Sequence, residues 1–330
     1  MLAAVSAPTR FRTLRPWLLA TFGRPVHRLA LDAGSSCPNR DGTRGRGGCA
    51  YCDVEGSGTG ALKSGLDLGA QLETGLARLA RREGGTAGVI AYFQSYSNTY
   101  VSPERLEEVL AVVEARALDP LVAVSVATRP DTLPGWALER LVRLGERIPV
   151  WVELGLEAAN DGVLTAINRL HTVAEFEDCA ARVRAAGLLC VAHAILGLPG
   201  DGREGARRTA EVLAASGVQG VKVHQLMVLE RTRFAAEWRA GRLAVLDERT
   251  YVEWLADFVE RLAPEQVLHR ITGDAEEGEL LAPRWSLDKN DVRAALEAEL
   301  ERRGTRQGAL CSTVDHRKAR PPAGSSIARA

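Results

Sequence analysis

Residues 188–226 read LLCVAHAILGLPGDGREGARRTAEVLAASGVQGVKVHQL, and this stretch predicts a strand, a helix and a second strand. The runs 188–196 and 220–226 are short and apolar, as buried parallel strands are. The amphipathic run 203–216 between them predicts a helix, and Gly217 stands where that helix should end. A helix that joins two such strands indicates that they run parallel in one sheet.

The same unit recurs along the chain toward the N-terminus. Further strands are expected at 26–31, 87–94, 121–127 and 150–156, and further helices at 68–82, 103–117, 134–147 and 173–186. About six units of this kind predict an α/β fold with a parallel sheet and helices outside. The sheet could be an open, doubly wound one or a full or partial barrel. In both forms the functional site lies at the C-terminal ends of the strands.

The pattern changes from about residue 232. Helices are expected at 234–240, 247–262 and 288–303, with a strand at 266–271. We therefore expect four parts: a loose N-terminus (1–10), a barrel core (11–232), a C-terminal α-rich extension packed on the barrel (233–303) and a tail (304–330). The tail is polar and rich in Arg, Pro, Ser and Gly, which predicts disorder.

Charge and cysteine usage narrow the class of protein. Lys and Arg together number 42, as do Asp and Glu, so the net charge is zero and no global field attracts nucleic acid. No apolar run approaches the roughly 20 residues of a membrane span, so we expect no membrane association. Three of the six cysteines are clustered and three are scattered, which favours a reducing cytoplasm over a secreted disulfide framework.

The clustered cysteines lie in the loop CPNRDGTRGRGGCAYC at 37–52, directly after the first expected strand. Three thiolates, Cys37, Cys49 and Cys52, would hold a four-iron cluster with one iron open to a substrate or cofactor. The alternative is a zinc site, which normally needs four ligands. Only one CxxC pair is present, although His27 is a conceivable fourth ligand.

This loop resembles the cluster loop of the radical S-adenosylmethionine (SAM) superfamily, in a variant with a lengthened first spacing. More narrowly, the chain resembles the YhcC/YtqA-like family, which is related to the elongator catalytic-subunit radical enzymes. Further matches cover roughly residues 10–300, among them YFQSYSNTY (92–100), TRPDTL (128–133), VELGLEAAND (152–161), NRLHT (168–172), HAILGLPGD (193–201) and KVHQLMVLERT (222–232).

The resemblance implies a partial (β/α)6 TIM-like barrel, one 4Fe-4S cluster on the three cysteines, and SAM bound to the open iron. An electron from the cluster would cleave SAM to a 5′-deoxyadenosyl radical, which abstracts a hydrogen from the substrate. A reductant such as flavodoxin or ferredoxin would supply the electron. The oligomeric state is not predicted.

Several residues are candidates for binding SAM. Gln94, Ser95 and Asn98 follow the second strand, where this superfamily contacts the methionine amino group. Glu153 and Glu157 share one face of a strand by period-two alternation, and we favour Glu157 for the ribose hydroxyls. Their alternative is a buried ion pair, for instance with Arg129 or His193. The resemblance places His193 and Gly197 beside adenine, although a lone strand histidine is often a core residue.

Candidates on the substrate side are polar residues in motif-like or apolar settings: Arg129, His224, Gln225, His269, Arg270 and Lys289. Arg129 would bind a carboxylate or form a structural salt bridge. Kinship with the elongator subunit implies transfer RNA (tRNA) as substrate, at a modified wobble uridine that carries a carboxymethylaminomethyl side chain. The alternatives are a small-molecule substrate, or a non-catalytic protein that binds an iron–sulfur cluster or zinc.

Overall fold

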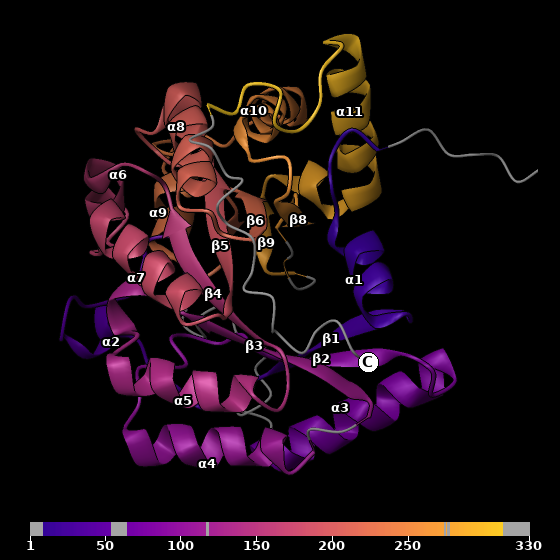
Figure 1. The fold of residues 1–330 in the computed structure, drawn as a ribbon. Coiled ribbons are helices and arrows are strands. Elements are labelled where there is room, and N and C mark those ends of the chain that lie inside the picture. Colours follow the sequence, from indigo (N-terminus) through magenta and orange to yellow (C-terminus); the bar gives the residue numbers. More distant parts are fainter. Residues whose placement is uncertain (1–8, 54–64, 117–118, 274, 276–277, 313–330) are drawn as a thin grey trace, which may run out of the picture.

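The computed structural model describes residues 9–53, 65–116, 119–273, 275 and 278–312. Its centre is one seven-stranded sheet in the order β1-β2-β3-β4-β5-β6-β8, and every neighbouring pair is parallel. The strands are β1 Val26–Leu31, β2 Gly88–Phe93, β3 Leu121–Thr128, β4 Val150–Glu157, β5 Leu189–Leu196, β6 Gly220–Gln225 and β8 Val267–Arg270. The sheet curls into a half-barrel (Figure 1).

Helices cover the outer face of this half-barrel (Figure 1). The helices of the described chain are α1 Leu14–Phe22, α2 Pro38–Asp41, α3 Leu68–Glu83, α4 Pro103–Glu114, α5 Gly135–Gly145, α6 Asp161–Ala166, α7 Val173–Ala185, α8 Gly202–Ala215, α9 Arg233–Arg239, α10 Glu248–Arg261 and α11 Lys289–Arg302. Of these, α1 lies at the N-terminal ends of the strands and α2 lies in the cysteine loop. Short 3-10 turns lie at Pro130–Thr132 and Arg284–Leu287, and β7 Val228–Leu229 pairs antiparallel with β9 Leu280–Ala282. No described helix combines the length and the apolar character that crossing a membrane requires.

The two faces of each strand serve different purposes because successive side chains point to opposite sides. Outward residues such as Val152 and Leu154 join the main apolar core with the helices. Inward residues Ile90 and Trp151 pack with Leu18 of α1, which closes the N-terminal end of the half-barrel. The interior at the other end of the strands is therefore left for a site.

The prediction of a partial α/β barrel with a C-terminal helical part is confirmed, and the doubly wound alternative is wrong. The six expected strands form within two residues of their predicted bounds. The strand expected at 266–271 was assigned to the C-terminal extension. In the structure it is β8, which pairs with β6 and extends the main sheet. Sequence reading assigned it to the extension because pairing between strands 40 residues apart leaves no local pattern. Helix α1 was not expected.

Residues 304–312, which were predicted to belong to a disordered tail, have a defined place in the structure. The Gln307 side chain donates to the carbonyls of Ala263 and Gln266, both at 2.8 Å, which holds residues 304–312 against the extension. Residues 313–330 lie outside the described residues, as do residues 1–8 of the predicted loose N-terminus.

Candidate functional site

A cavity of about 530 Å³ opens at the C-terminal ends of the strands. All three clustered cysteines line it, together with residues that reach inward from β2, β3, β4, β5, β6 and β8. The predicted candidates in its wall are Gln94, Arg129, Glu153, Glu157, His193, His224, Gln225 and Arg270. The expectation of one shared face at the strand ends is met for these residues.

The cluster loop is folded by its own backbone and by the segment after α6. The Gly48 amide donates to the Asn39 carbonyl at 2.9 Å, and the Asn168 side chain donates to the Gly48 carbonyl at 2.7 Å. Gly48 has a φ of 77°, and a Cβ there would lie 3.0 Å from the Arg40 guanidinium. Glycine at 48 therefore permits both the turn and the close approach of Arg40.

Donor groups surround the cysteine sulfurs. The Asn39 amide nitrogen lies 3.5 Å from the Cys49 sulfur, and the Arg40 guanidinium lies 3.4 Å from the Cys52 sulfur. Burial raises the pKa of the Cys52 thiol to about 12, against the opposing effect of the Arg40 charge. N–H donors and positive charge favour the thiolate form in which cysteine binds iron, so this part of the cavity wall fits an iron–sulfur cluster.

The three sulfurs are not arranged as ligands of one ion. Across the described parts of the chain, no three His, Cys, Asp or Glu side chains form a group that could hold a single metal ion. In a four-iron cluster each cysteine binds a different iron, so the cluster requires only that the three thiols face one shared space. Cys37, Cys49 and Cys52 meet that requirement.

A second group of side chains forms at the end of β4. The Arg169 guanidinium donates to the Gly155 carbonyl at 3.1 Å, lies 3.4 Å from a Glu157 carboxylate oxygen and lies 4.0 Å from the Cys49 sulfur. Glu157 has a φ of 69°, a left-handed conformation that is rare for a residue with a side chain. Arg169 therefore links the cluster loop to Glu157, the carboxylate favoured for ribose.

Sequence reasoning did not select Arg169, although it lies in the quoted motif NRLHT. The residue stands in a loop twelve positions after Glu157, and strand periodicity does not reach it. Arg129, which was selected, is almost fully buried and donates to both carboxylate oxygens of Asp131 at 2.8 and 2.7 Å. The structural salt bridge foreseen as its alternative is thus present, in the wall of the cavity.

A polar layer forms the floor of the cavity around Glu153. This carboxylate accepts from Ser125 Oγ at 2.7 Å, lies 2.8 Å from His193 Nε2 and accepts from Lys222 Nζ. Burial alone would raise the pKa of Glu153, but the Lys222 charge and the His193 hydrogen bond outweigh it and hold that pKa well below its usual range. The alternative foreseen for Glu153, a buried ion pair, is therefore present, with Lys222 as the main partner.

Lys222 is the cavity residue that sequence reasoning missed most plainly. It lies two positions before His224 on the same face of β6, within a run otherwise read as apolar. Two signals could have identified it: it lies two positions from His224, which puts both side chains on one face of the strand, and it is a charged residue inside a buried strand.

Five predicted candidates do not line the cavity. The Asn98 side chain donates to the carbonyls of Phe93 and Ala127 and so joins the ends of β2 and β3. His269 forms a hydrogen bond with Arg28 at 2.8 Å and packs on Trp151, which lies with α1 at the closed end of the half-barrel. The other three are Ser95, which is fully buried, Gly197, whose missing Cβ leaves room for Leu246, and Lys289, which is exposed at the start of α11.

Comparison with known proteins agrees with this geometry. The radical SAM superfamily model matches residues 40–213, and the model of the radical SAM C-terminal domain matches residues 218–302. The YtqA protein of Bacillus subtilis is 37% identical over 310 residues, which are 94% of this chain and 95% of that protein. The YhcC protein of Escherichia coli is 34% identical over 296 residues, which are 89% of this chain and 93% of that one.

More distant similarities extend beyond this family. A tRNA uridine(34) acetyltransferase of Dehalococcoides mccartyi is 25% identical over 196 residues, which are 58% of this chain and 42% of that protein. The solved structure of Elp3 from Methanocaldococcus infernus superposes with a TM-score of 0.66 at 16% identity, covering 86% of this chain and 64% of that one, and shows a shared fold.

Proteins of this superfamily are enzymes that use a 4Fe-4S cluster on three cysteines together with SAM, and they need an external reductant. The matches extend over most of the sequence, and the curled sheet, the cavity at its strand ends and the cysteine loop agree with them. The chain therefore belongs to the radical SAM superfamily and, within it, to the YhcC/YtqA-like family.

Proposed function

We propose that this chain is a cytoplasmic radical SAM enzyme that modifies the wobble uridine of tRNA, with Cys37, Cys49 and Cys52 as the cluster ligands. The observation that carries the proposal is the meeting of these three thiols and the Glu157–Arg169 pair in one strand-end cavity. Arg40 and Asn39 stabilise the thiolates by donating to them. A reductant such as flavodoxin or ferredoxin supplies the electron.

Glu157 is the carboxylate best placed to bind the ribose of SAM. Glu153 is already engaged by Ser125, His193 and Lys222, whereas the Glu157 carboxylate has Arg169 at 3.4 Å and lines the cavity. Gln94 would accept from the amino group of SAM, and His193 would border its adenine. When bound, the reduced cluster and SAM supply a 5′-deoxyadenosyl radical; the residues of the chain orient SAM and substrate and exclude water.

Two observations support a tRNA substrate. The relative from Dehalococcoides mccartyi acts by name on uridine 34 of tRNA and matches more than half of this chain. The cavity, at about 530 Å³, is of the size that holds one or two small ligands, so a polymer would have to insert a single unstacked nucleoside. A wobble uridine in a single-stranded anticodon loop can enter in this way. The target would be its carboxymethylaminomethyl side chain.

Replacement of the three cysteines by alanine tests the cluster assignment. Anaerobically purified wild-type protein should contain about four iron and four sulfide per chain and form 5′-deoxyadenosine with dithionite. The Cys37/Cys49/Cys52→Ala variant should lose both, while the control Cys311→Ser, at a thiol outside the cavity, should keep both. Stoichiometric zinc in colourless protein would refute the assignment.

A comparison of wobble nucleosides tests the substrate. tRNA from cells with and without the gene is digested and its nucleosides are quantified by mass spectrometry. We expect a carboxymethylaminomethyl nucleoside to accumulate without the gene, and the triple cysteine variant should fail to reverse this. Identical profiles, with 5′-deoxyadenosine formation intact, would contradict the tRNA substrate and favour a small molecule.

A further inference from the structure

The chain uses lysine rarely, and one lysine lies inside the barrel. Of its 42 cationic residues only four are lysine: Lys63, Lys222, Lys289 and Lys318. Among the described residues, Lys222 is the lysine that lies in a strand, and only 2% of its surface is exposed. Arginine serves where a fixed positive charge suffices, because it does not release its proton in proteins. A lysine inside the barrel therefore indicates that the site needs a cation that can release its proton.

The contacts of Lys222 leave one donor for a ligand. Its ammonium group has three N–H bonds. Two are used by the Glu153 carboxylate and by the Tyr92 hydroxyl at 3.1 Å, and the side chain lines the cavity. A group that enters the cavity can therefore take the third.

Burial, together with the surrounding charges, allows Lys222 both of its protonation states near neutral pH. Burial lowers the pKa of Lys222 to about 7; the Glu153 charge opposes this, and Arg28 and Arg270 add to it. The titratable and charged groups that face it are Arg28 on β1, Tyr92 on β2, Glu153 on β4, His193 on β5, His224 on its own strand, and His269 and Arg270 on β8.

We propose that Lys222 is an acid–base residue that delivers a proton to the substrate in this cavity, and that Glu153 and His193 connect it to the proton supply. In the transfer, an N–H bond of Lys222 breaks, its electron pair stays on nitrogen, and the proton bonds to an oxygen or nitrogen of the substrate. His193, whose side chain is 21% exposed and touches the same Glu153 oxygen, returns a proton from water.

Substitution of Lys222 separates proton transfer from charge. Lys222→Arg keeps a positive charge but cannot release a proton, and Lys222→Gln keeps a donor without charge. Both variants should retain the iron content and the 5′-deoxyadenosine formation of the wild type within about threefold. Product formation should fall by about 10²–10⁴-fold, the usual contribution of a general acid. Arg140→Lys, a buried cation between α4 and α5, is the matched control and should leave both rates unchanged.

The product assay rests on the proposed function, because it uses tRNA as the substrate. A second measurement does not depend on the substrate. With only four lysines, selective ¹³Cε-lysine labelling of the cluster-bearing enzyme gives four NMR signals, and Lys222→Arg identifies the one from Lys222. We expect that signal to titrate with a midpoint near 7.

A failure of the proposed tRNA substrate can be distinguished from a failure of the proposed role of Lys222. If the wild type leaves tRNA unchanged, the proposed substrate is wrong, and the titration alone decides the role of Lys222. A Lys222 signal that does not titrate below pH 9 overturns the inference, as does a Lys222→Arg variant that forms product within about threefold of the wild-type rate. Slow product formation with intact SAM cleavage supports it.

Discussion

At the residue scale, Gly155 determines whether Glu157 and Arg169 can meet. A Cβ at 155 would lie 2.3 Å from a Glu157 carboxylate oxygen and 2.4 Å from an Arg169 nitrogen, well inside van der Waals contact. Only a residue without a side chain leaves both groups where they are. The pair in turn borders the space that we assign to SAM.

Gly155→Ala should therefore weaken SAM binding. We expect the dissociation constant for SAM to rise about tenfold or more, or roughly 1.4 kcal/mol, because the new methyl group displaces the Glu157–Arg169 pair. Anaerobic equilibrium dialysis of the iron-loaded protein measures this. Gly135→Ala, where a Cβ meets nothing within 4 Å, is the matched control and should bind SAM as the wild type does. Equal affinities for the two variants would contradict the placement of SAM at this pair.

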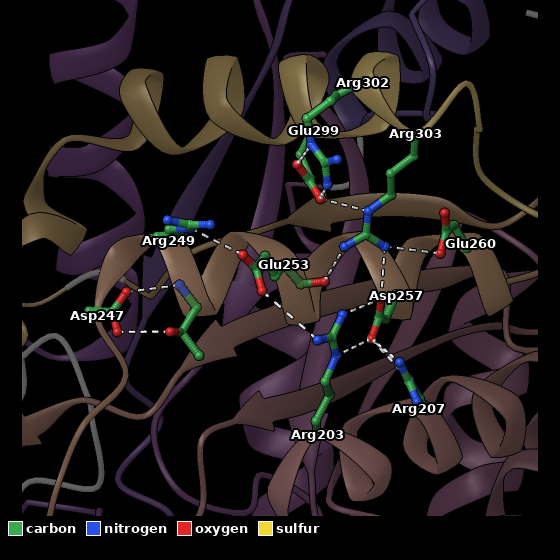
Figure 2. Close-up of polar contacts among 11 residues, drawn as sticks. Arg203, Arg207, Asp247, Arg249, Glu253, Asp257, Glu260, Glu299, Arg302 and Arg303 are labelled. Atoms are coloured by element: carbon green, nitrogen blue, oxygen red, sulfur yellow. Dashed lines mark hydrogen bonds and ion pairs between the residues drawn. The ribbon is translucent and has the colours of Figure 1, made fainter.

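At the scale of elements, a charged cluster attaches the C-terminal extension to the barrel. Asp257 on α10 accepts from Arg203 and Arg207 of α8 and from Arg303, which follows α11, at 2.6–2.8 Å (Figure 2). Glu260 and Glu299 also contact Arg303. Asp257 thus joins three segments that are about 50 residues apart in sequence.

Loss of the Asp257 charge should destabilise the fold. Burial alone would raise the pKa of Asp257, but the three arginines outweigh it and lower that pKa below its usual 3.8. Asp257→Asn should reduce the free energy of unfolding by about 2 kcal/mol, because hydrogen bonds to charged groups are lost. Arg302→Ala, at an exposed pair, should cost less than about 1 kcal/mol. Urea unfolding at pH 7 measures the free energies of unfolding of the wild type and of both variants.

The same charge sets a pH dependence with a definite sign. Since the pKa of Asp257 is lowered by folding, its stabilisation is complete above about pH 3.8 and is lost as the pH falls through the lower value of the folded state. The difference in unfolding free energy between wild type and Asp257→Asn should be constant from pH 5 to 8 and shrink below pH 4. A difference that grows on acidification would refute this account.

At the scale of the whole molecule, the extension completes the sheet. β8 pairs with β6, Leu268 also bridges to Thr13 just before α1, and Arg270 contributes to the cavity wall. The segment that leads into α1 and the C-terminal extension therefore meet beside the barrel. The sheet, the closing helix α1 and the cavity form one unit that depends on β8.

A chain that stops at residue 263 should not fold as the full chain does. It lacks β8, which leaves β6 as an unprotected edge strand, and it lacks the Leu268 and Arg303 contacts. We expect it to be largely insoluble, or to melt at least about 10 °C lower with loss of iron binding. A soluble truncated chain with the melting temperature of the full chain would show that the extension is dispensable.

The sequence by itself determined the features that rest on local patterns. Short apolar runs alternate with amphipathic ones, and this repeat predicted six strands of the half-barrel because burial of both faces of a strand leaves a continuous apolar run. The loop with Cys37, Cys49 and Cys52 was recognisable because all three thiols lie within 16 residues. Period-two alternation also predicted that Glu153 and Glu157 share one face.

Only the tertiary structure decided which side chains meet across distances in sequence. It paired Glu153 with Lys222, placed Arg169 between Glu157 and Cys49, and moved the strand at 267–270 into the main sheet. It also separated Asn98, His269 and Lys289 from the cavity. Such contacts depend on strand order, register and loop path, which arise from packing of the whole chain, and no short-range pattern in the sequence records them.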